Sequence, residues 1–368
     1  MAVNSSITMD HPFVKTVYCT GSPYNIGFTH GSCVSAEVHS NVATYTFFFN
    51  ETAQITWQQA RERAVAQFFP TLERSYPEIL EEMKGIAEGA GGGLTRDDIL
   101  TLNVRSEISL TNHADGCTSI SQSTEEGEIF LAQNWDWLEE LRNGMVLLHI
   151  KPTESDIDFK FLSEAGLVGK IGMNSAGFGF CMNAIRSGAF NSANFPVHIM
   201  SRRLLQYDTS FDSAIAILDQ FGVASAINYM LGDKSGNHAD IECSPYGNSL
   251  ILPHDGFVAH TNHLYGPHRR SNLVDHPAAN SFSRLSRIQL LTEIDKRMEV
   301  PTTFESLRSR LSDELGTPFS ICRDRPPGAV GMERMTTLST IMMKLKSGKG
   351  VVLIGRPCDE LPIVKWSF

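Results

Sequence analysis

Ala114-Asp115-Gly116-Cys117-Thr118-Ser119 is the stretch at which the hydrophobic pattern of this chain changes. Residues 1–116 are predicted to be mostly helical, whereas residues 117–368 alternate as strands with helices between them. Cys117 stands at the first position of the first strand after this change. If the peptide bond before it were cut, its own α-amine would lie within reach of its thiol and could act as the base for that nucleophile. The Gly116–Cys117 bond is therefore the first candidate site of chemistry.

Composition limits the classes of function that the chain can have. It has 368 residues, which is enough for one large domain or two ordinary ones, and 42% of them are hydrophobic and 20% charged, as in soluble globular proteins. A net charge of −10 without a basic run argues against a nucleic-acid partner. No apolar run reaches the roughly 18 residues of a membrane span, and Met1 to Pro12 lacks the apolar core of a secretory signal. We expect a cytoplasmic protein with neither a nucleic-acid nor a membrane partner.

The cysteines indicate no metal site, and two compact basic clusters are the candidates for a site that binds an anion. Seven cysteines are widely spaced without a Cys-x-x-Cys pair, so neither a zinc site nor a disulfide framework is predicted. Most cysteines of an intracellular chain are small buried hydrophobes. Arg202-Arg203 and His268-Arg269-Arg270 are interpreted as solvated surface.

Periodicity predicts helices first and then sheets sandwiched by helices. Upstream, a short strand over 13–20 precedes helices within 24–49, 55–69, 77–88 and 95–104, and the glycine cluster 89–93 is interpreted as a helix stop. Downstream, the predicted strands are 117–123, 129–137, 145–150, 159–164, 170–174, 178–184, 226–231, 239–243, 249–252, 257–261, 336–345 and 350–354. The predicted downstream helices are 197–221, 281–296 and 303–313.

Cys117 and Asp136 are predicted to meet across a hairpin. A turn near Glu126 joins the first two downstream strands, and it would bring Asp136 close to the first residue of the first strand. Attack of the Cys117 thiol on the Gly116 carbonyl, followed by hydrolysis, would free an α-amine whose pKa is close to neutral. Asp136 could anchor that amine or orient a substrate amine, and the alternative is an aspartate that bonds backbone at a strand end.

Two later segments supply further polar candidates. Asn262, in His260-Thr261-Asn262-His263 after a predicted strand, is a natural amide donor for an oxyanion hole. The two histidines lack a third ligand nearby, so no metal is predicted and they are interpreted as supports or packing. Arg323, in Phe319-Ser320-Ile321-Cys322-Arg323, could hold a carboxylate or pair with Asp136, and the alternative is a surface arginine.

Together these segments resemble the acyl-coenzyme A:6-aminopenicillanate (isopenicillin N) acyltransferase family, and the chain is similar to its fungal acyltransferase-like members. The resemblance is carried by Asp115-Gly116-Cys117-Thr118, Gln133-Asn134-Trp135-Asp136, Glu164-Ala165-Gly166, 172–177, Asn183-Ala184, 260–263 and 319–323. It implies the α+β class, an N-terminal-nucleophile hydrolase fold and a four-layer αββα sandwich. It also implies autocatalytic cleavage at Gly116–Cys117 into an α chain (1–116) and a β chain (117–368) that form one globular unit.

By position, the resemblance implies a role for each candidate. The nucleophile for cleavage and turnover would be Cys117, the holder of the amine Asp136, the oxyanion donor Asn262, and the residue that completes the site Arg323. Asn183 stands where the related bile-salt and penicillin V amidases keep a polar site residue. Those amidases have an arginine three residues before the aspartate, and Gln133 at that position favours the acyltransferase branch.

The resemblance implies acyl transfer from a thioester or amide to an amine or water through an acyl-Cys117 intermediate. It implies no cofactor, with acyl-coenzyme A as a candidate substrate and a small-molecule acyl donor and amine acceptor as partners. Trp366-Ser367-Phe368 is not the peroxisomal signal of the penicillin-making members, so other substrates are expected. The alternatives are an amidohydrolase of small N-acyl amines and a catalytically lapsed binding paralogue. Trp135, Trp137 and Phe190 are candidates to line the pocket, with at least two of them expected to be core aromatics.

Overall fold

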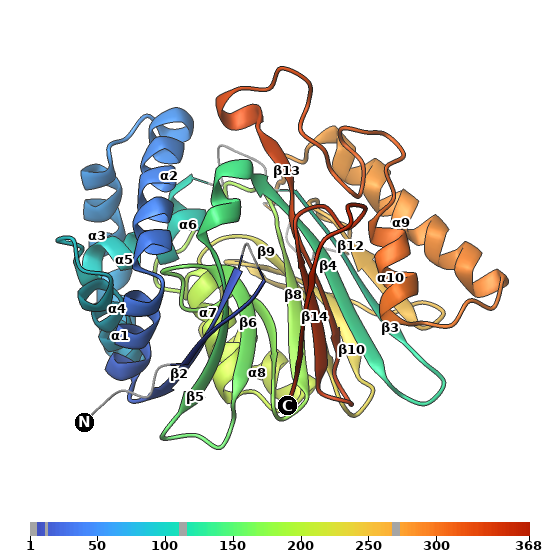
Figure 1. The fold of residues 1–368 in the computed structure, drawn as a ribbon, viewed down its shortest axis with the longest axis horizontal. Coiled ribbons are helices and arrows are strands. Elements are labelled where there is room, and N and C mark those ends of the chain that lie inside the picture. The colour runs from blue at the N-terminus through green and yellow to red at the C-terminus, as the bar shows by residue number, and fades with distance from the viewer. Residues whose placement is uncertain (1–5, 12–13, 110–115, 267–272) are drawn as a thin grey trace.

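The computed structural model describes residues 6–11, 14–109, 116–266 and 273–368. The predicted turn at Asp115 and the basic cluster His268-Arg269-Arg270 lie outside these residues. Two sheets pack face to face, with contacts from β3 and β4 of one sheet to β8 and β9 of the other (Figure 1). This is the sheet-on-sheet arrangement that the sequence predicts.

Among the described residues, nine strands form the larger sheet and six form the smaller one. The larger sheet has the order β1 (Ser6–His11), β2 (Val14–Gly21), β5 (Met145–Pro152), β6 (Phe159–Glu164), β7 (Ile171–Asn174), β8 (Phe178–Ala184), β9 (Ile227–Asp233), β10 (His238–Ser244), β11 (Gly247–Ile251). The smaller sheet has the order β12 (Phe257–His260), β3 (Gly116–Ser123), β4 (Ile129–Leu138), β13 (Met335–Lys344), β14 (Lys349–Ile354), β15 (Ile363–Ser367). Every position of β4, β9 and β10 is buried, because the strands have a sheet on one face and further layers on the other.

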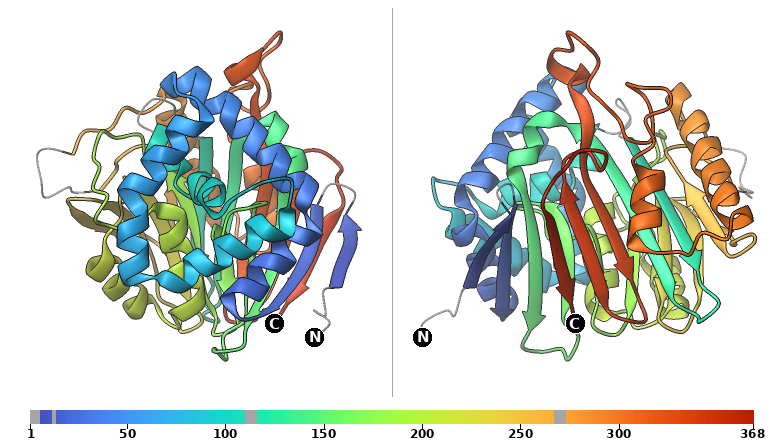
Figure 2. Two further views of the ribbon diagram at one scale, coloured as in Figure 1. Left: turned by 90° about the vertical axis from the view of Figure 1, so that its left-hand side faces the viewer. Right: turned by 45° about the vertical axis from the view of Figure 1, so that its right-hand side comes forward.

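Helices cover both outer faces of this pair of sheets. The upstream helices are α1 (Pro23–Cys33), α2 (Ser35–Ala53), α3 (Trp57–Ser75), α4 (Pro77–Ala90), α5 (Arg96–Asn103) and α6 (Arg105–Ser109). The downstream helices are α7 (Val197–Tyr207), α8 (Phe211–Phe221), α9 (Ala279–Arg297) and α10 (Phe304–Leu311), with short 3-10 turns at Glu139–Gly144 and Gly331–Glu333. Helices α7 and α8 contact the larger sheet, whereas α9 and α10 contact the smaller one. Figure 2 shows the upstream helices in front of the sheets from one side and α9 and α10 on the other.

Local sequence signals account for the upstream helix boundaries. Thr56 begins α3 and Thr95 begins α5, each through a capping box in which its hydroxyl accepts from a backbone N–H three residues later. Helix α4 begins at Pro77 and stops at Gly91, whose φ of 68° favours glycine. The helix starts at Pro77 and Thr95 and the stop at the glycine cluster were predicted from the sequence and are confirmed, whereas the cap at Thr56 was not predicted. No described helix has both the length and the apolar character that crossing a bilayer would take.

The upstream segment is built into the larger sheet. Strand β2 pairs in parallel with β5, with Lys15 opposite Val146 and Gly21 opposite Pro152. Arg202 on α7 was predicted to lie on the surface, and this prediction is wrong: its side chain is 2% exposed, and its guanidinium donates two 2.7 Å hydrogen bonds to Glu82 on α4. Sequence cannot show this, because the two partners lie 120 positions apart. Upstream helices and downstream layers therefore share buried polar contacts as well as apolar ones.

Candidate active site

The β3–β4 hairpin places Gly116 opposite Asp136 and Cys117 opposite Trp135. The sequence predicted this pairing, and the register confirms it. Strand β12 pairs along the other edge of β3, with His260 opposite Ser119, so the residues that follow β12 run toward the start of β3. Three neighbouring strands thus deliver the candidate side chains to one end of the smaller sheet.

Cys117 is held on both sides of its own peptide unit. Its side chain is buried, with 2% of the residue exposed. Its backbone N–H donates to Asn262 Oδ1 at 2.9 Å, and its carbonyl oxygen accepts a short hydrogen bond from Arg284 Nη1. Arg284 Nη1 also donates to Thr118 Oγ1 at 3.0 Å, while Nη2 donates to Asn262 Oδ1 at 2.8 Å. One guanidinium therefore fixes the backbone of the candidate nucleophile and the amide beside it.

Asn262 reaches Cys117 as an acceptor. Its Oδ1 takes hydrogen bonds from Cys117 N–H and from Arg284, and this pair of donors fixes the orientation of the amide. Its Nδ2 donates to the carbonyl of Ala184 at 3.1 Å. Nδ2 is the atom that would donate to an oxyanion. With the Gly116–Cys117 bond intact, it points toward β8. The sequence predicted the proximity of Asn262 to Cys117 but not this orientation.

Asp136 is a buried carboxylate next to two arginines. Its Oδ1 accepts from Thr337 Oγ1 at 2.7 Å, and no hydrogen bond from the described residues reaches its Oδ2. Burial raises the pKa of Asp136, although the charges of Arg284 and Arg323 and the Thr337 hydrogen bond act in the opposite direction. A carboxyl group with a raised pKa is suited to accept a proton, and its buried Oδ2 can accept a hydrogen bond from an ammonium group.

Gly116 leaves no room for a side chain between Asp136 and Arg323. A Cβ atom at Gly116 would lie 2.8 Å from Asp136 Cβ, 2.9 Å from its Oδ2 and 3.2 Å from Arg323 Nη1. The Arg323 backbone is tied to β13, since its N–H donates to Thr337 Oγ1 at 2.9 Å and its carbonyl accepts from Thr337 N–H at 3.1 Å. Thr337 therefore holds both the carboxylate and the arginine that flank the residue before Cys117.

Asn183 lies between the two sheets, away from the Cys117 backbone. Its Oδ1 accepts from Ser119 Oγ at 2.7 Å and from Asn228 Nδ2 at 3.1 Å. Within the described part of the chain, its own Nδ2 has no hydrogen-bond partner. Asn228 in turn donates to Asp240 Oδ1 at 2.6 Å. Asn183 is thus linked to the strand of Cys117 through Ser119.

The two histidines support the Asn262 segment. His260 Nε2 lies 3.0 Å from Glu242 Oε1, and its Nδ1 lies 2.9 Å from the Thr261 carbonyl, so both ring nitrogens face acceptors. Burial opposes the charged ring, but Asp240 and the Glu242 hydrogen bond raise the pKa of His260 above its usual value. His263 Nδ1 lies 2.7 Å from Ser281 Oγ. This matches the interpretation of both rings as supports.

A small cavity borders Cys117 between the sheets. Its volume is about 20 Å³, room for about one water molecule. Its lining residues include Cys117, Trp135, Lys170, Arg105 and Met182. Of the three aromatic candidates, Trp135 lines this cavity. Trp137 instead donates to Tyr45 on α2, and Phe190 packs against Phe68 on α3.

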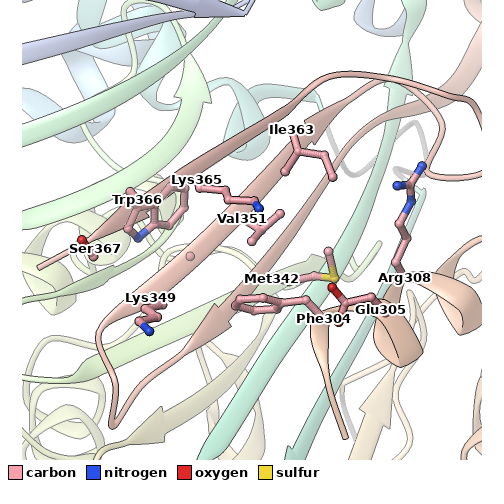
Figure 3. A pocket seen from close by; sticks show the side chains of 11 residues that line it. Phe304, Glu305, Arg308, Met342, Lys349, Val351, Ile363, Lys365, Trp366 and Ser367 are labelled. Atoms are coloured by element: carbon pink, nitrogen blue, oxygen red, sulfur yellow. The ribbon is translucent and has the colours of Figure 1, made fainter.

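A larger groove lies on the outer face of the smaller sheet, beside α10 (Figure 3). Its volume is about 450 Å³. It is lined by Phe304, Glu305, Arg308, Met342, Lys349, Gly350, Val351, Ile363, Lys365, Trp366 and Ser367. None of these is a candidate site residue, so the groove and the Cys117 cluster are separate features.

Comparison with known proteins shows the family to which the chain belongs. Residues 123–358 match the model of the acyl-coenzyme A:6-aminopenicillanic acid acyl-transferase family. The chain belongs to that family. Within it, the chain is 30% identical over 346 residues to the acyl-coenzyme A:6-aminopenicillanic-acid-acyltransferase 40 kDa form of Emericella nidulans. The alignment covers 93% of this chain and 92% of that protein.

The comparisons also match two hydrolases, at lower identity. The β-alanyl-dopamine/carcinine hydrolase of Drosophila melanogaster is 25% identical over 255 residues, covering 63% of this chain and 65% of that protein. The conjugated bile acid hydrolase of Clostridium perfringens superposes with a TM-score of 0.48 and 12% identity, covering 68% of this chain and 97% of that one. The chain is therefore an enzyme of the class that transfers acyl groups or hydrolyses amides.

Two residues of the cluster escaped sequence reasoning. Arg284 was predicted only as part of a helix, and Thr337 only as part of a strand. Neither stands in a motif, and their partners Cys117 and Asp136 lie 167 and 201 positions away. The only available signal for Arg284 was a cation on a helix otherwise expected to pack on a sheet.

Proposed function

We propose that this chain cuts itself at Gly116–Cys117 and then transfers acyl groups through the thiol of Cys117. One observation carries the proposal: the N–H and the carbonyl of Cys117 are both held by site residues, Asn262 and Arg284, while Asp136 and Arg323 flank Gly116. A structural cysteine at a strand start has no need of this arrangement. A nucleophile needs it, because its thiol must lie at a fixed position relative to the Gly116 carbonyl during cleavage and relative to its own amine during turnover.

Self-cleavage would begin with an N-to-S acyl shift. Cys117 Sγ attacks the Gly116 carbonyl carbon, the Cys117 nitrogen leaves with a proton, and a thioester joins the two residues. Water then attacks the thioester, which releases Gly116 as a carboxylate and Cys117 with a free thiol and α-amine. Asn262 Oδ1, 2.9 Å from the Cys117 nitrogen, is placed to accept from the N–H of the amide and then from the amine.

Turnover would use the amine that cleavage creates. An α-amine has a pKa of about 7.7–8.0, so near neutral pH it can take the thiol proton of Cys117 and return it to a leaving group. A thioester donor, such as acyl-coenzyme A, passes its acyl group to Sγ and leaves as a thiol. A small amine then attacks acyl-Cys117, an amide forms and the thiol is restored. Asp136, with its raised pKa, is placed to hold the amine that attacks or the freed amine of Cys117.

Residues 1–116 would remain bound after cleavage as the smaller chain. Strand β2 lies inside the larger sheet, hydrogen-bonded to β1 on one side and β5 on the other. Buried side chains add polar ties: Asn41 Nδ2 donates to the carbonyls of Gly144 and Ala165 at 2.9 Å each, and Tyr45 donates a short hydrogen bond to Glu164. Separating the chains would break these hydrogen bonds and the pairing of β2 with β5.

Mass spectrometry of the purified protein tests the proposal. We expect two fragments that meet at Gly116/Cys117, a single intact chain for Cys117→Ala, and normal cleavage for the control Cys181→Ala, which removes a buried thiol from β8. The cleaved protein should consume an acyl thioester, and Cys117→Ala should not. An intact wild-type chain after prolonged incubation, with no thioester consumed, would contradict the proposal. A fluorescent fusion would test the expected cytoplasmic location.

A second candidate is amide hydrolysis by the same thiol. The 20 Å³ cavity beside Cys117 has room for the one water molecule that would replace the amine as acceptor. Comparing kcat/KM for candidate N-acyl amines and for thioester–amine pairs distinguishes the two. If water is the acceptor, thioester consumption is unchanged by added amine. A binding paralogue without turnover would give neither product.

A further inference from the structure

Two free thiols lie in contact beside the segment that carries Arg323. Cys322 Sγ and Cys358 Sγ are 2.9 Å apart, although 36 positions separate them. Cys322 directly precedes Arg323, and Cys358 lies in the connection between β14 and β15. A disulfide has an S–S length of about 2.05 Å, so bond formation needs the sulfur atoms to approach by roughly 0.9 Å.

Hydrogen bonds hold the backbone on both sides of this pair. The N–H of Cys322 donates to the Asp313 carbonyl at 2.9 Å, and its carbonyl accepts from Ser320 Oγ at 2.6 Å. On the other side, Arg308 donates from Nε to the Pro357 carbonyl and from Nη2 to the Asp359 carbonyl, at 2.9 Å each. The thiols are therefore kept together by contacts that do not involve sulfur, and little chain entropy is left to lose on cross-linking.

The surroundings give one thiol access to a reagent and protect the other. Cys322 is fully buried, whereas Cys358 is half-buried. Arg356 lies close to both sulfur atoms and carries a positive charge that favours their thiolates. An oxidant can therefore react first with the thiol of Cys358. The thiol of Cys322 can then displace the group left on Cys358.

We propose that Cys322 and Cys358 form a reversible disulfide that pins the Arg323 segment to the β14–β15 connection. A small disulfide such as oxidised glutathione is the oxidant. The Cys358 thiolate attacks it and releases one glutathione thiol; the Cys322 thiolate then attacks the mixed disulfide at Cys358 and releases the second. The two cysteine sulfurs lose one electron each to the two glutathione sulfurs, and the two cysteine protons pass to the leaving thiolates.

The bond would stiffen the site rather than reshape it. A cross-link over a loop of this length restricts the unfolded chain, and for a protein of this size we expect Tm to rise by about 3–5 °C. Burial raises the pKa of both thiols, so exchange should be slow at neutral pH and faster as the pH rises.

The test uses the wild-type protein and Cys358→Ser, each kept in reducing buffer or treated with oxidised glutathione. Thiols are alkylated before digestion and the peptides are mapped by mass spectrometry. We expect a peptide pair linked through Cys322 and Cys358 in the oxidised wild type only, with the rise in Tm, and reversal of both by dithiothreitol.

Two results would overturn the proposal. One is a stable glutathione adduct at Cys358 with Cys322 still alkylated, because the second thiol would then not have reached the first. The other is that, in the protein treated with oxidised glutathione, both cysteines are alkylated as fast as Cys33, a half-buried cysteine on α1. Cys322→Ser should carry the adduct at Cys358 and no link. The mapped bond does not depend on acyl transfer, so either result leaves the proposed function separately testable.

Discussion

Replacing Arg284 by methionine is the sharpest perturbation of the proposed site. Methionine keeps most of the length and apolar stem of the side chain, which is only 3% exposed, and removes the charge and every donor. The Cys117 carbonyl, Thr118 Oγ1 and Asn262 Oδ1 would each lose a charged hydrogen-bond donor in a buried setting.

The expected loss is large in both stability and chemistry. A hydrogen bond to a charged group is worth about 1.5–3 kcal/mol, and such bonds are not additive within one cluster, so we expect about 3–5 kcal/mol of destabilisation. Cys117 and Asn262 would no longer be fixed relative to each other, and a misplacement near 1 Å costs about 10²-fold in rate. Asp136 would also lose a neighbouring cation. Its raised pKa would rise further, so activity that needs the carboxylate would fall off at a higher pH.

Cleavage kinetics, urea unfolding and a pH–rate profile measure these effects. The matched control is Arg287→Met, one turn later on α9, which breaks a partly exposed pair with Asp313 worth about 0–1 kcal/mol. Arg284→Lys should restore charge and so return the acidic limb of the pH profile, without restoring all three hydrogen bonds. If Arg284→Met cleaves at the wild-type rate and unfolds like Arg287→Met, the positioning role is refuted.

Three further changes test other parts of the fold. Gly116→Ala should slow self-cleavage at least about tenfold in a mass-spectrometric time course, because its Cβ would displace Asp136; unchanged kinetics would contradict this. Burial raises the pKa of Asp240 to about 7, so the folded state binds more protons than the unfolded state between about pH 4 and 7. Wild-type stability should therefore fall as the pH rises from about 4 to 7 and level off above 7. Asp240→Asn should remove roughly 1–3 kcal/mol of that fall between pH 5 and 8 in urea titrations. Arg202→Leu should cost about 3–5 kcal/mol by leaving Glu82 buried and unpaired, and Glu82→Gln with Arg202→Met should recover part of it in thermal unfolding.

Local patterns predicted the parts of this molecule that local physics determines. The β3–β4 hairpin follows from alternation and a turn near Glu126, and once that turn is placed, Asp136 must stand beside Gly116. The helix start at Thr95 and the stop at Gly91 also rest on contacts within a few residues.

Long-range polar contacts were not predictable in the same way. Nothing near Arg284 in the chain indicates that its guanidinium reaches the Cys117 carbonyl. Arg202 looked like a surface residue until its partner Glu82 was placed. Proximity alone also left orientation undetermined. Asn262 lies beside Cys117 as the resemblance implies, but the amide direction depends on donors from α9 and an acceptor on β8 that no motif specifies.

The contact between Cys117 and Asn262 explains why cleavage would have to precede turnover. As long as the bond to Gly116 is intact, the Cys117 nitrogen is an amide that can donate but has no basic lone pair. Asn262 Oδ1 already accepts from it at 2.9 Å, and Arg284 holds that oxygen in place. Cutting the bond turns the same nitrogen into an amine without requiring any of these partners to move. The amine that acts as the base is then formed in a site whose geometry exists before cleavage. The Arg284 and Gly116 variants should therefore slow cleavage, and they should reduce acyl transfer because less of the protein is cleaved.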